Sequence, residues 1–213
     1  MPARHRKAAV IVAHPDDETL WCGGFILDHP TWAWHVVCLC RADDSDRAPK
    51  FRRVAEHLGV AGSIGELDDS PEQAPLAGDR VRATVLSLLP RGRFDLMFTH
   101  GPLGEYTRHR RHEECCRAVV ELWQASLLHT GRLCLFAYED GGGTYSPRAR
   151  ADADRRYRLS PGTLRRKRDI ITRFYGFSDQ SWEARTTPEV EGFECFRSPV
   201  EALRRVDACE VMT

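Results

Sequence analysis

Ionisable side chains crowd a short stretch near the start of the chain: His14, Asp16, Asp17 and Glu18, with Pro15 between the first two. Three adjacent carboxylates repel one another unless a cation or solvent compensates their charge. Because His14 and Asp17 are three residues apart, both can face one ion while Asp16 points elsewhere. Imidazole with carboxylate suits zinc and other first-row divalent metals. The stretch therefore predicts part of a metal site, and the acidic first turn of a helix is the alternative explanation.

A second group of candidate ligands lies in the run His109-Arg110-Arg111-His112. Residues i and i+3 share one face of a helix, so His109 and His112 can project into the same crevice. A lone His-x-x-His arises easily by chance in a chain with nine histidines. Two such clusters, each following a strand-like segment and preceding a helix, are a stronger indication of a metal site.

The two clusters together supply the ligand count of a catalytic metal. A catalytic zinc typically keeps three protein ligands and one open position for water. We expect His14, Asp17 and His112 to be the ligands. Asp16 and His109 are then free for acid–base chemistry.

These clusters must be positioned by an alternation of strands and helices. Short apolar segments rich in β-branched or aromatic residues predict strands, and apolar residues at three- and four-residue spacing predict helices. The expected strands are 8–13, 35–40, 94–99 and 133–138, and the expected helices are 19–28, 49–58, 79–89 and 113–128. This pattern predicts a Rossmann-like α/β fold, with an open, mostly parallel sheet and helices on both faces. In such folds ligands bind beyond the carboxyl ends of the strands.

Length and composition favour one enzyme-sized domain without a charged partner. We expect a single domain over residues 1–213, with a core at about 8–140 and a C-terminal extension, 141–213, packed on it. The 31 basic and 31 acidic side chains balance, so no nucleic-acid partner is expected. The Arg-rich stretch 148–168 is interpreted as a solvated helix or loop. The sequence is compatible with a homo-oligomer.

The remaining segments predict a cytoplasmic protein without a membrane span. The longest apolar run, Trp32–Cys40, is far shorter than the roughly 20 residues that cross a bilayer. The basic N-terminus is followed by only a short apolar segment, so no signal peptide is expected. The eight cysteines are interpreted as reduced and buried. Cys115 and Cys116 are adjacent, which favours helix packing over a shared metal.

The Ala13-His14-Pro15-Asp16-Asp17-Glu18 segment resembles the hallmark of the PIG-L (LmbE-like) de-N-acetylase family. The resemblance spans roughly residues 8–138 and implies a Rossmann-like fold. It also implies hydrolytic removal of acetyl groups from N-acetylglucosamine-type substrates. Many members have His-Pro-Asp-His where this chain has His109-Arg110-Arg111-His112, so the resemblance is weakest for the substrate class.

The resemblance also assigns roles to individual residues. It implies that His14, Asp17 and His112 hold the metal, that Asp16 is the general base, and that His109 stabilises the oxyanion. For substrate binding it points to Tyr106, as a tyrosine that swings over the substrate, and to Arg47 or Arg41, as the arginine that follows the second strand. Arginines are common on protein surfaces, so ordinary solvent exposure is the alternative for Arg47 and Arg41.

Together these observations predict a zinc-dependent N-deacetylase, using Zn²⁺ or another first-row divalent metal. Its expected partner is a small-molecule acetylated amino sugar. The alternatives are a metal-dependent amidase or esterase that acts on another acylated small molecule, and a metal-binding module without catalysis. A dinucleotide-binding module is disfavoured because no Gly-x-Gly-x-x-Gly follows the first strand.

Overall fold

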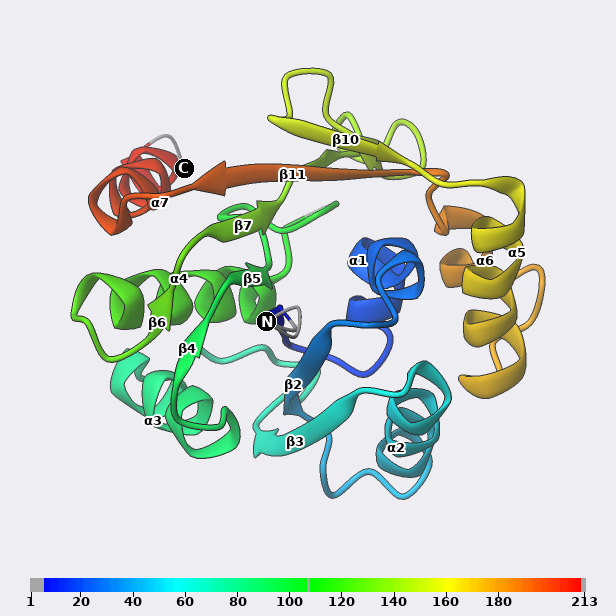
Figure 1. Ribbon diagram of the computed structural model, residues 1–213, viewed down its shortest axis with the longest axis horizontal. Helices are drawn as coiled ribbons and strands as arrows, with labels where there is room; N and C mark the ends of the chain where they lie inside the picture. The colour runs from blue at the N-terminus through cyan, green and yellow to red at the C-terminus, as the bar shows by residue number, and fades with distance from the viewer. Residues whose placement is uncertain (1–5, 107, 212–213) are drawn as a thin grey trace, which may run out of the picture.

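A mostly parallel sheet forms the centre of the molecule, as seen in a computed structural model that describes residues 6–106 and 108–211 (Figure 1). Within these residues the sheet has seven strands, in the spatial order β10 (Arg155–Arg158), β11 (Val190–Phe196), β7 (Leu133–Phe136), β5 (Leu96–Thr99), β1 (Lys7–Val12), β2 (Ala33–Cys40) and β3 (Ala61–Leu67). The strands from β7 to β3 run parallel, whereas β11 is antiparallel to β7 and β10 is antiparallel to β11. Two short ribbons flank this sheet: β4 (Arg93–Phe94) with β6 (His129–Thr130), and β8 (Tyr138–Glu139) with β9 (Arg148–Ala149).

Helices cover both faces of the sheet (Figure 1). One layer contains α3 (Gly78–Leu88), α4 (Arg110–Gln124) and α7 (Pro199–Val211), with α4 in contact with both neighbours. The other layer contains α1 (Asp17–Asp28), α2 (Arg47–Leu58), α5 (Pro161–Asp169), the π-helix η1 (Ile170–Phe174) and α6 (Trp182–Thr186). None of the helices in the described part of the chain is both long and apolar enough to cross a bilayer.

The side chains of β1 show why this strand lies at the centre. Ala9 and Ile11 face the core under α3 and α4, whereas Ala8, Val10 and Val12 face the core under α1 and α2. A strand that is buried on both faces needs apolar residues at consecutive positions rather than in alternation. The strand therefore ends at the point where the sequence becomes polar, and that point lies at the carboxyl edge of the sheet.

The expected α/β fold is confirmed, with corrections at the edges. The four expected strands and four expected helices are all present within a few residues of their predicted ends. Strand β3 was not predicted because Gly62, Ser63, Gly65 and Glu66 interrupt its apolar pattern. The Arg-rich stretch is only partly a solvated helix or loop, because it contains β9 and β10 as well as α5.

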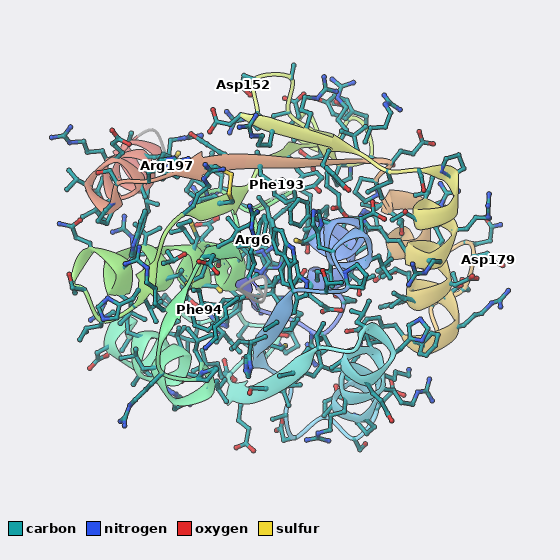
Figure 2. All side chains as sticks on the ribbon, in the orientation of Figure 1. Arg6, Phe94, Asp152, Asp179, Phe193 and Arg197 are labelled. Atoms are coloured by element: carbon teal, nitrogen blue, oxygen red, sulfur yellow. A yellow bond between two sulfur atoms is a disulfide. The ribbon has the colours of Figure 1, made fainter. Side chains whose placement is uncertain are left out.

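The expectation that all cysteines are reduced is wrong for Cys134 and Cys195, which form a disulfide (Figure 2). The pair joins β7 to β11, where the two residues lie directly opposite each other in the antiparallel register. Antiparallel pairing brings opposite residues within disulfide range. The pairing could not be foreseen because β11 was not predicted as a neighbour of β7. The other six cysteines are buried and form no disulfide.

A buried ion pair ties the C-terminal extension to α1. Lys167 Nζ donates to Glu191 Oε1 at 2.7 Å, and both side chains are fully buried. The same carboxylate accepts from the backbone N–H groups of Gly24 and Phe25, at 2.7 and 2.8 Å. Burial lowers the pKa of Lys167 and raises that of Glu191. A Cβ at Gly24 would overlap with the end of the Leu159 side chain, which would have to move to admit a larger residue.

We expect Lys167→Met to destabilise the fold by about 3–5 kcal/mol, because it leaves the buried Glu191 carboxylate without its partner. Urea denaturation measures the loss. Lys50→Met is the matched control, since Lys50 pairs with the exposed Asp46 carboxylate and its removal should cost about 1 kcal/mol or less. Equal losses in the two variants would show that the buried pair contributes no more than a surface pair.

Candidate active site

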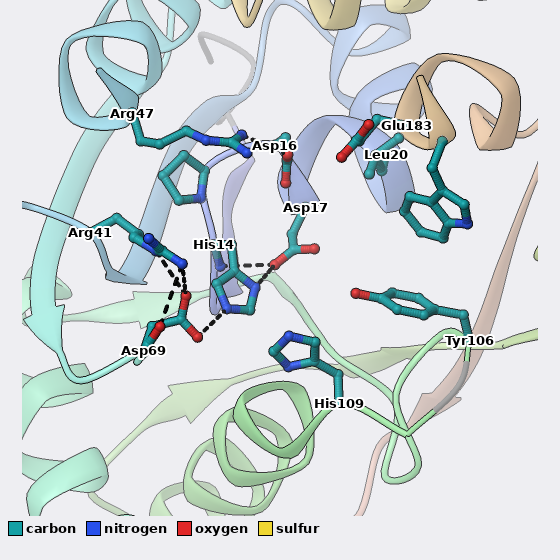
Figure 3. Close-up of a pocket in the computed structure, with 12 residues that line it drawn as sticks. His14, Asp16, Asp17, Leu20, Arg41, Arg47, Asp69, Tyr106, His109 and Glu183 are labelled. Atoms are coloured by element: carbon teal, nitrogen blue, oxygen red, sulfur yellow. Dashed lines mark hydrogen bonds and ion pairs between the residues drawn. The ribbon is translucent and has the colours of Figure 1, made fainter. Parts of the chain in front are cut away.

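A pocket opens at the carboxyl edge of the sheet, where the sequence clusters were expected to meet (Figure 3). Its volume is about 260 Å³. The segment after β1 forms its floor, and the segments after β2, β3 and β5 contribute to its walls. It contains all but one of the predicted site residues; the exception, His112, lies buried directly behind His14.

The predicted ligand atoms come together at the floor of this pocket. His14 Nδ1 lies 3.1 Å from both Asp17 Oδ2 and His112 Nε2, and Asp17 Oδ2 lies 3.4 Å from His112 Nε2. Tetrahedral coordination with bonds of about 2.0–2.1 Å requires ligand atoms about 3.3–3.4 Å apart. The triangle formed by His14, Asp17 and His112 therefore has the size that a first-row metal needs.

Both histidines of this triangle have their second ring nitrogen beside a carboxylate. His14 Nε2 lies 3.1 Å from Asp69 Oδ1, and His112 Nδ1 lies 2.6 Å from Glu105 Oε2. A carboxylate in this position fixes the tautomer and the orientation of a metal-binding imidazole. The free electron pairs of His14 Nδ1 and His112 Nε2 are thereby directed toward Asp17.

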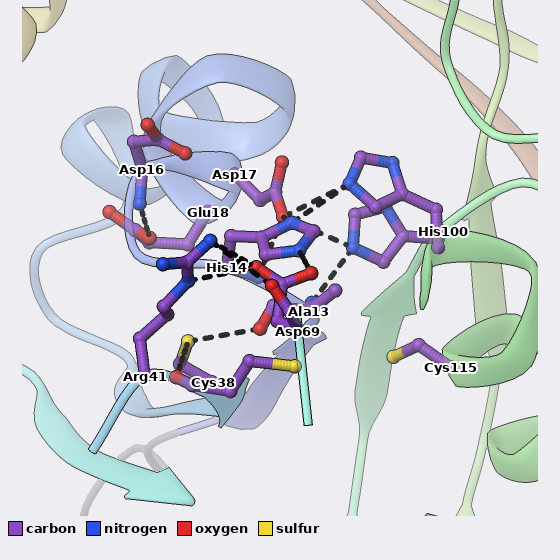
Figure 4. A network of polar contacts seen from close by, with 12 residues as sticks. Ala13, His14, Asp16, Asp17, Glu18, Cys38, Arg41, Asp69, His100 and Cys115 are labelled. Carbon is purple, nitrogen blue, oxygen red and sulfur yellow. Dashed lines mark hydrogen bonds and ion pairs between the residues drawn. The ribbon is translucent and has the colours of Figure 1, made fainter. Parts of the chain in front are cut away.

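His100 is a fully buried neighbour of this cluster, and sequence reasoning gave it no role (Figure 4). Its Nε2 accepts from the backbone N–H of Ala13 at 2.9 Å, and its Nδ1 lies 2.9 Å from Glu105 Oε2. The ring stacks on His112, with 3.8 Å between ring centroids. Although ligand atoms of His100, Asp17 and His112 lie close together, both nitrogens of His100 already have partners. We therefore assign it to the supporting layer.

Burial and charge shift the pKa values of this supporting layer in opposite directions. Burial alone would raise the pKa of Glu105, but His100 and His112 beside it lower that pKa to about 2. Burial alone would lower the pKa of His100, but Glu105 and Asp17 act in the opposite direction and raise it. In the neutral ring that accepts from Ala13, the proton lies on Nδ1, beside Glu105. Glu105 is therefore held as a carboxylate, able to accept from both rings.

The two neighbouring aspartates differ in their surroundings. Burial on its own raises the pKa of Asp17, but His112 and His100 more than offset it and hold the pKa well below its usual value. Burial and the charge of Asp17 raise the pKa of Asp16 well above its usual value. Asp17 does begin α1, as the helix-terminus explanation required, yet its carboxylate faces the two histidines.

Asp16 is held away from the ligand triangle by its backbone. Its φ of 114° lies in the left-handed region that non-glycine residues rarely adopt. Its N–H donates to Glu18 Oε2 at 3.1 Å, and Tyr175 Oη donates to Glu18 Oε1 at 2.7 Å. The Asp16 carboxylate accepts from Arg47 Nη1 at 3.1 Å. Asp16 thus presents its carboxylate to the pocket next to Asp17 without joining the triangle.

His109 lines the pocket beside the same triangle. Its ring centroid lies 4.7 Å from that of His14 and 4.5 Å from that of His112. Burial and the two neighbouring histidines lower its pKa to about 4. Within the described residues its buried Nδ1 has no hydrogen-bond partner. His109 also belongs to a group with His14 and His112 whose ligand atoms lie within 4.8 Å of one another.

Two walls of different character enclose the pocket (Figure 3). Arg41 and Arg47 lie on one side, and Arg41 Nε donates to Asp69 Oδ2 at 2.8 Å. Tyr106 lies on the other side with its hydroxyl directed into the pocket. Both expected substrate-binding residues, Arg47 and Tyr106, are therefore pocket residues, and Arg41 lines the pocket as well. Sequence reasoning missed Asp69, because the acidic pair Asp68-Asp69 follows β3, a strand that was itself not predicted.

Arg110 and Arg111, which replace residues of the family pattern, do not line this pocket. Arg111 is buried and donates to the backbone carbonyls of Asp68 and Ala74, and it pairs with Glu114 at 2.7 Å. It therefore fixes the loop that carries Asp69. Cys115 is buried within α4 near Thr99, as its packing interpretation predicted.

Comparison with solved structures shows that the fold is shared by proteins of different activity. A 4-carboxy-2-hydroxymuconate hydratase from Pseudomonas putida KT2440 is 16% identical with a TM-score of 0.62, and the match covers 89% of this chain and 95% of that chain. A triple mutant of a deacetylase of teicoplanin biosynthesis is 14% identical with a TM-score of 0.59, covering 90% and 98%. A zinc-inhibited form of teicoplanin deacetylase is 15% identical with a TM-score of 0.55, also covering 90% and 98%. At these identities the similarity shows the fold.

The family is shown by sequence. No curated protein sequence matches the chain. The sequence model described as PIG-L, GlcNAc-PI de-N-acetylase, matches residues 9–123, which is more than half of the chain. The matched stretch contains both the segment His14–Glu18 and the run from His109 to His112, and it supports a metal-dependent deacetylase. The chain belongs to the PIG-L, or GlcNAc-PI de-N-acetylase, family.

Proposed function

We propose that this protein is a divalent-metal-dependent hydrolase that removes the acetyl group from an N-acetylglucosamine-type amino sugar. One observation carries the proposal most strongly. His14 Nδ1, Asp17 Oδ2 and His112 Nε2 converge from segments 98 residues apart in the sequence. A carboxylate lies behind each imidazole, and a pocket opens in front of the triangle.

The donor set fits Zn²⁺ or another first-row divalent metal, held by His14, Asp17 and His112. When bound there, such an ion supplies Lewis acidity, which polarises the amide carbonyl and acidifies water. Asp69 and Glu105 keep the two imidazoles oriented toward the ion. Two imidazoles and one carboxylate leave room for water and substrate on the pocket side.

The residues beside the triangle can move the protons that amide hydrolysis requires. Asp16 takes the proton of the attacking water, because its carboxylate faces the pocket and is kept out of the triangle by its backbone. The leaving amine is protonated as the C–N bond breaks, either by Asp16 returning this proton or by His109. His109 donates a hydrogen bond to the oxyanion that forms from the carbonyl oxygen. Arg47 holds Asp16 in place and, with Tyr106, contacts the substrate across the mouth of the pocket.

The small pocket supports a small-molecule substrate. Its volume of about 260 Å³ lies below the roughly 300–1,000 Å³ of typical drug-sized ligand sites. The acetamido group and the ring that carries it therefore occupy the pocket, and the remainder of a larger substrate extends into solvent.

Acetate release from a panel of N-acetylglucosamine derivatives tests this proposal. The purified chain is supplied in turn with Zn²⁺, Mn²⁺, Co²⁺ or Fe²⁺, and acetate and free amine are measured together. We expect the two products in equal amounts. N-butyryl analogues and acetate esters in the same panel test an amidase or esterase. If the protein hydrates 4-carboxy-2-hydroxymuconate and releases acetate from none of the amide substrates, it is instead a hydratase.

We expect Glu105→Gln to weaken metal binding by about 10–100-fold. Glu105 Oε2 accepts from both His112 and His100, and Oε1 accepts from the backbone N–H of Gly101. The amide is uncharged, and with its oxygen beside the two rings its NH₂ group would face the Gly101 N–H without an acceptor. Competition with a chromophoric chelator measures the affinity. Glu113→Gln on the same helix is the control, because the Glu113 carboxylate pairs with Arg108 outside the pocket. Unchanged affinity in Glu105→Gln would contradict the supporting role of this carboxylate.

A further inference from the structure

One wall of the pocket comes from the C-terminal extension, beyond the residues that the family model matches. Helix α6 contributes Trp182 and Glu183 to the pocket lining. The catalytic chemistry described above uses neither residue. Their position at the mouth makes them candidates for recognising the part of the substrate that carries the acetamido group.

Trp182 completes an aromatic surface with Tyr106 on this wall. Their ring centroids lie 4.7 Å apart, and the ring of Trp21 lies behind them at 6.5 Å from Trp182 and 6.1 Å from Tyr106. Trp21 is fully buried, whereas Trp182 is 38% exposed. Trp182 therefore keeps ring surface available for a ligand, supported by buried aromatic packing.

Glu183 adds a hydrogen-bond acceptor beside this aromatic surface. Figure 3 shows its carboxylate next to Leu20, facing the pocket. Among the described residues no hydrogen bond or ion pair engages this carboxylate, unlike those of Asp16 and Asp69. An ionised carboxylate accepts hydrogen bonds and cannot donate them. The free acceptor therefore suits hydroxyl or amine donors on a ligand.

We propose that Trp182 and Glu183 select substrates in which a saturated, polyhydroxylated six-membered ring carries the acetamido group. This inference rests on the proposed function of the same pocket. The C–H face of such a ring carries slight positive charge and stacks on the negative face of an indole. Its hydroxyl groups at the ring edge donate to Glu183. An aromatic surface beside a carboxylate also suits a cation, so a cationic group is the alternative that the binding experiment below must exclude.

Two substrates with the same acetamide isolate this effect. N-acetylglucosamine carries the ring, and N-acetylethanolamine carries only a short chain. We expect Trp182→Ala to raise KM for N-acetylglucosamine about 10-fold with little change in kcat, and to leave N-acetylethanolamine unaffected. Glu183→Gln should lower kcat/KM for the cyclic substrate about 10-fold, and Trp182→Phe should keep most of the ring preference. Tyr145→Ala is the control, an aromatic residue of similar exposure (37%) outside the pocket.

Calorimetric binding of N-acetylglucosamine to the metal-free protein gives a second readout that needs no turnover. Weaker binding of N-acetylglucosamine in Trp182→Ala but not in Tyr145→Ala supports the inference even if no acetate is released. The absence of acetate release would count only against the proposed hydrolysis. Equal loss on both substrates, or equal calorimetric binding in Trp182→Ala and the parental protein, overturns it. The inference is also overturned if Trp182→Ala loses binding of tetramethylammonium but keeps binding of N-acetylglucosamine, because the aromatic surface would then recognise a cation.

Discussion

Asp16→Asn is expected to lower turnover by about 10²–10⁴-fold while leaving the bound metal and the fold unchanged. Asparagine keeps the shape of the side chain and tolerates the left-handed backbone at this position (φ 114°). Alanine would add backbone strain to the loss of the base. The N–H of residue 16 still donates to Glu18, so the loop keeps its support.

Steady-state kinetics with metal analysis of the same samples measures this effect. Asp46→Asn is a control on a nearby loop, because the exposed Asp46 carboxylate pairs with Lys50 and does not line the pocket. Parental turnover in Asp16→Asn would refute its role as general base. If both the parental protein and Asp16→Asn bind metal and neither shows turnover, a metal-binding module without catalysis is the better explanation.

His112→Ala is expected to lose the bound metal and all measurable turnover, whereas His109→Ala should keep the metal and lose about 10²–10³-fold in kcat. The difference follows from geometry: His112 Nε2 belongs to the ligand triangle, and His109 stands beside it. Metal content per chain after gel filtration decides between the two roles.

Because His112 is fully buried, its removal also opens a cavity. Asp17→Asn serves as a second ligand variant that keeps the side-chain volume, and it should lose metal too. Thermal melting of all three variants shows whether metal loss reflects unfolding. Equal loss of metal from folded His112→Ala and His109→Ala would contradict the assignment and favour the group His14, His109 and His112. Equal retention of metal would contradict the assignment as well, because His112 would then not be a ligand.

The sequence predicted the centre of the fold well because burial there is complete. In β1 and the residue after it, apolar residues run without a break from Ala8 to Ala13, and the first polar residue, His14, marks the carboxyl edge. The site followed from this, because ligands from different loops meet at that edge. Edge strands β3 and β10 escaped prediction because glycine, serine or arginine dilutes their apolar pattern.

The supporting residues could not be identified from the sequence for a physical reason. Asp69, His100 and Glu105 act through contacts between loops, and local spacing does not record which loops touch. Glu105 resembles any acidic loop residue until the structure places its carboxylate between two imidazoles. The C-terminal extension, which carries Trp182, was expected only to pack on the core, and the place of Trp182 at the pocket depends on the path of the whole extension.

Titration of the metal-free protein with one divalent metal, with acetate release measured at each step, tests the central claim most directly. N-acetylglucosamine is the substrate, and bound metal is counted on the same samples. We predict that acetate release rises in proportion to bound metal and stops rising at one ion per chain. Acetate release at full rate in the metal-free protein would contradict the account. So would the absence of acetate release at one bound ion per chain with every one of Zn²⁺, Mn²⁺, Co²⁺ and Fe²⁺.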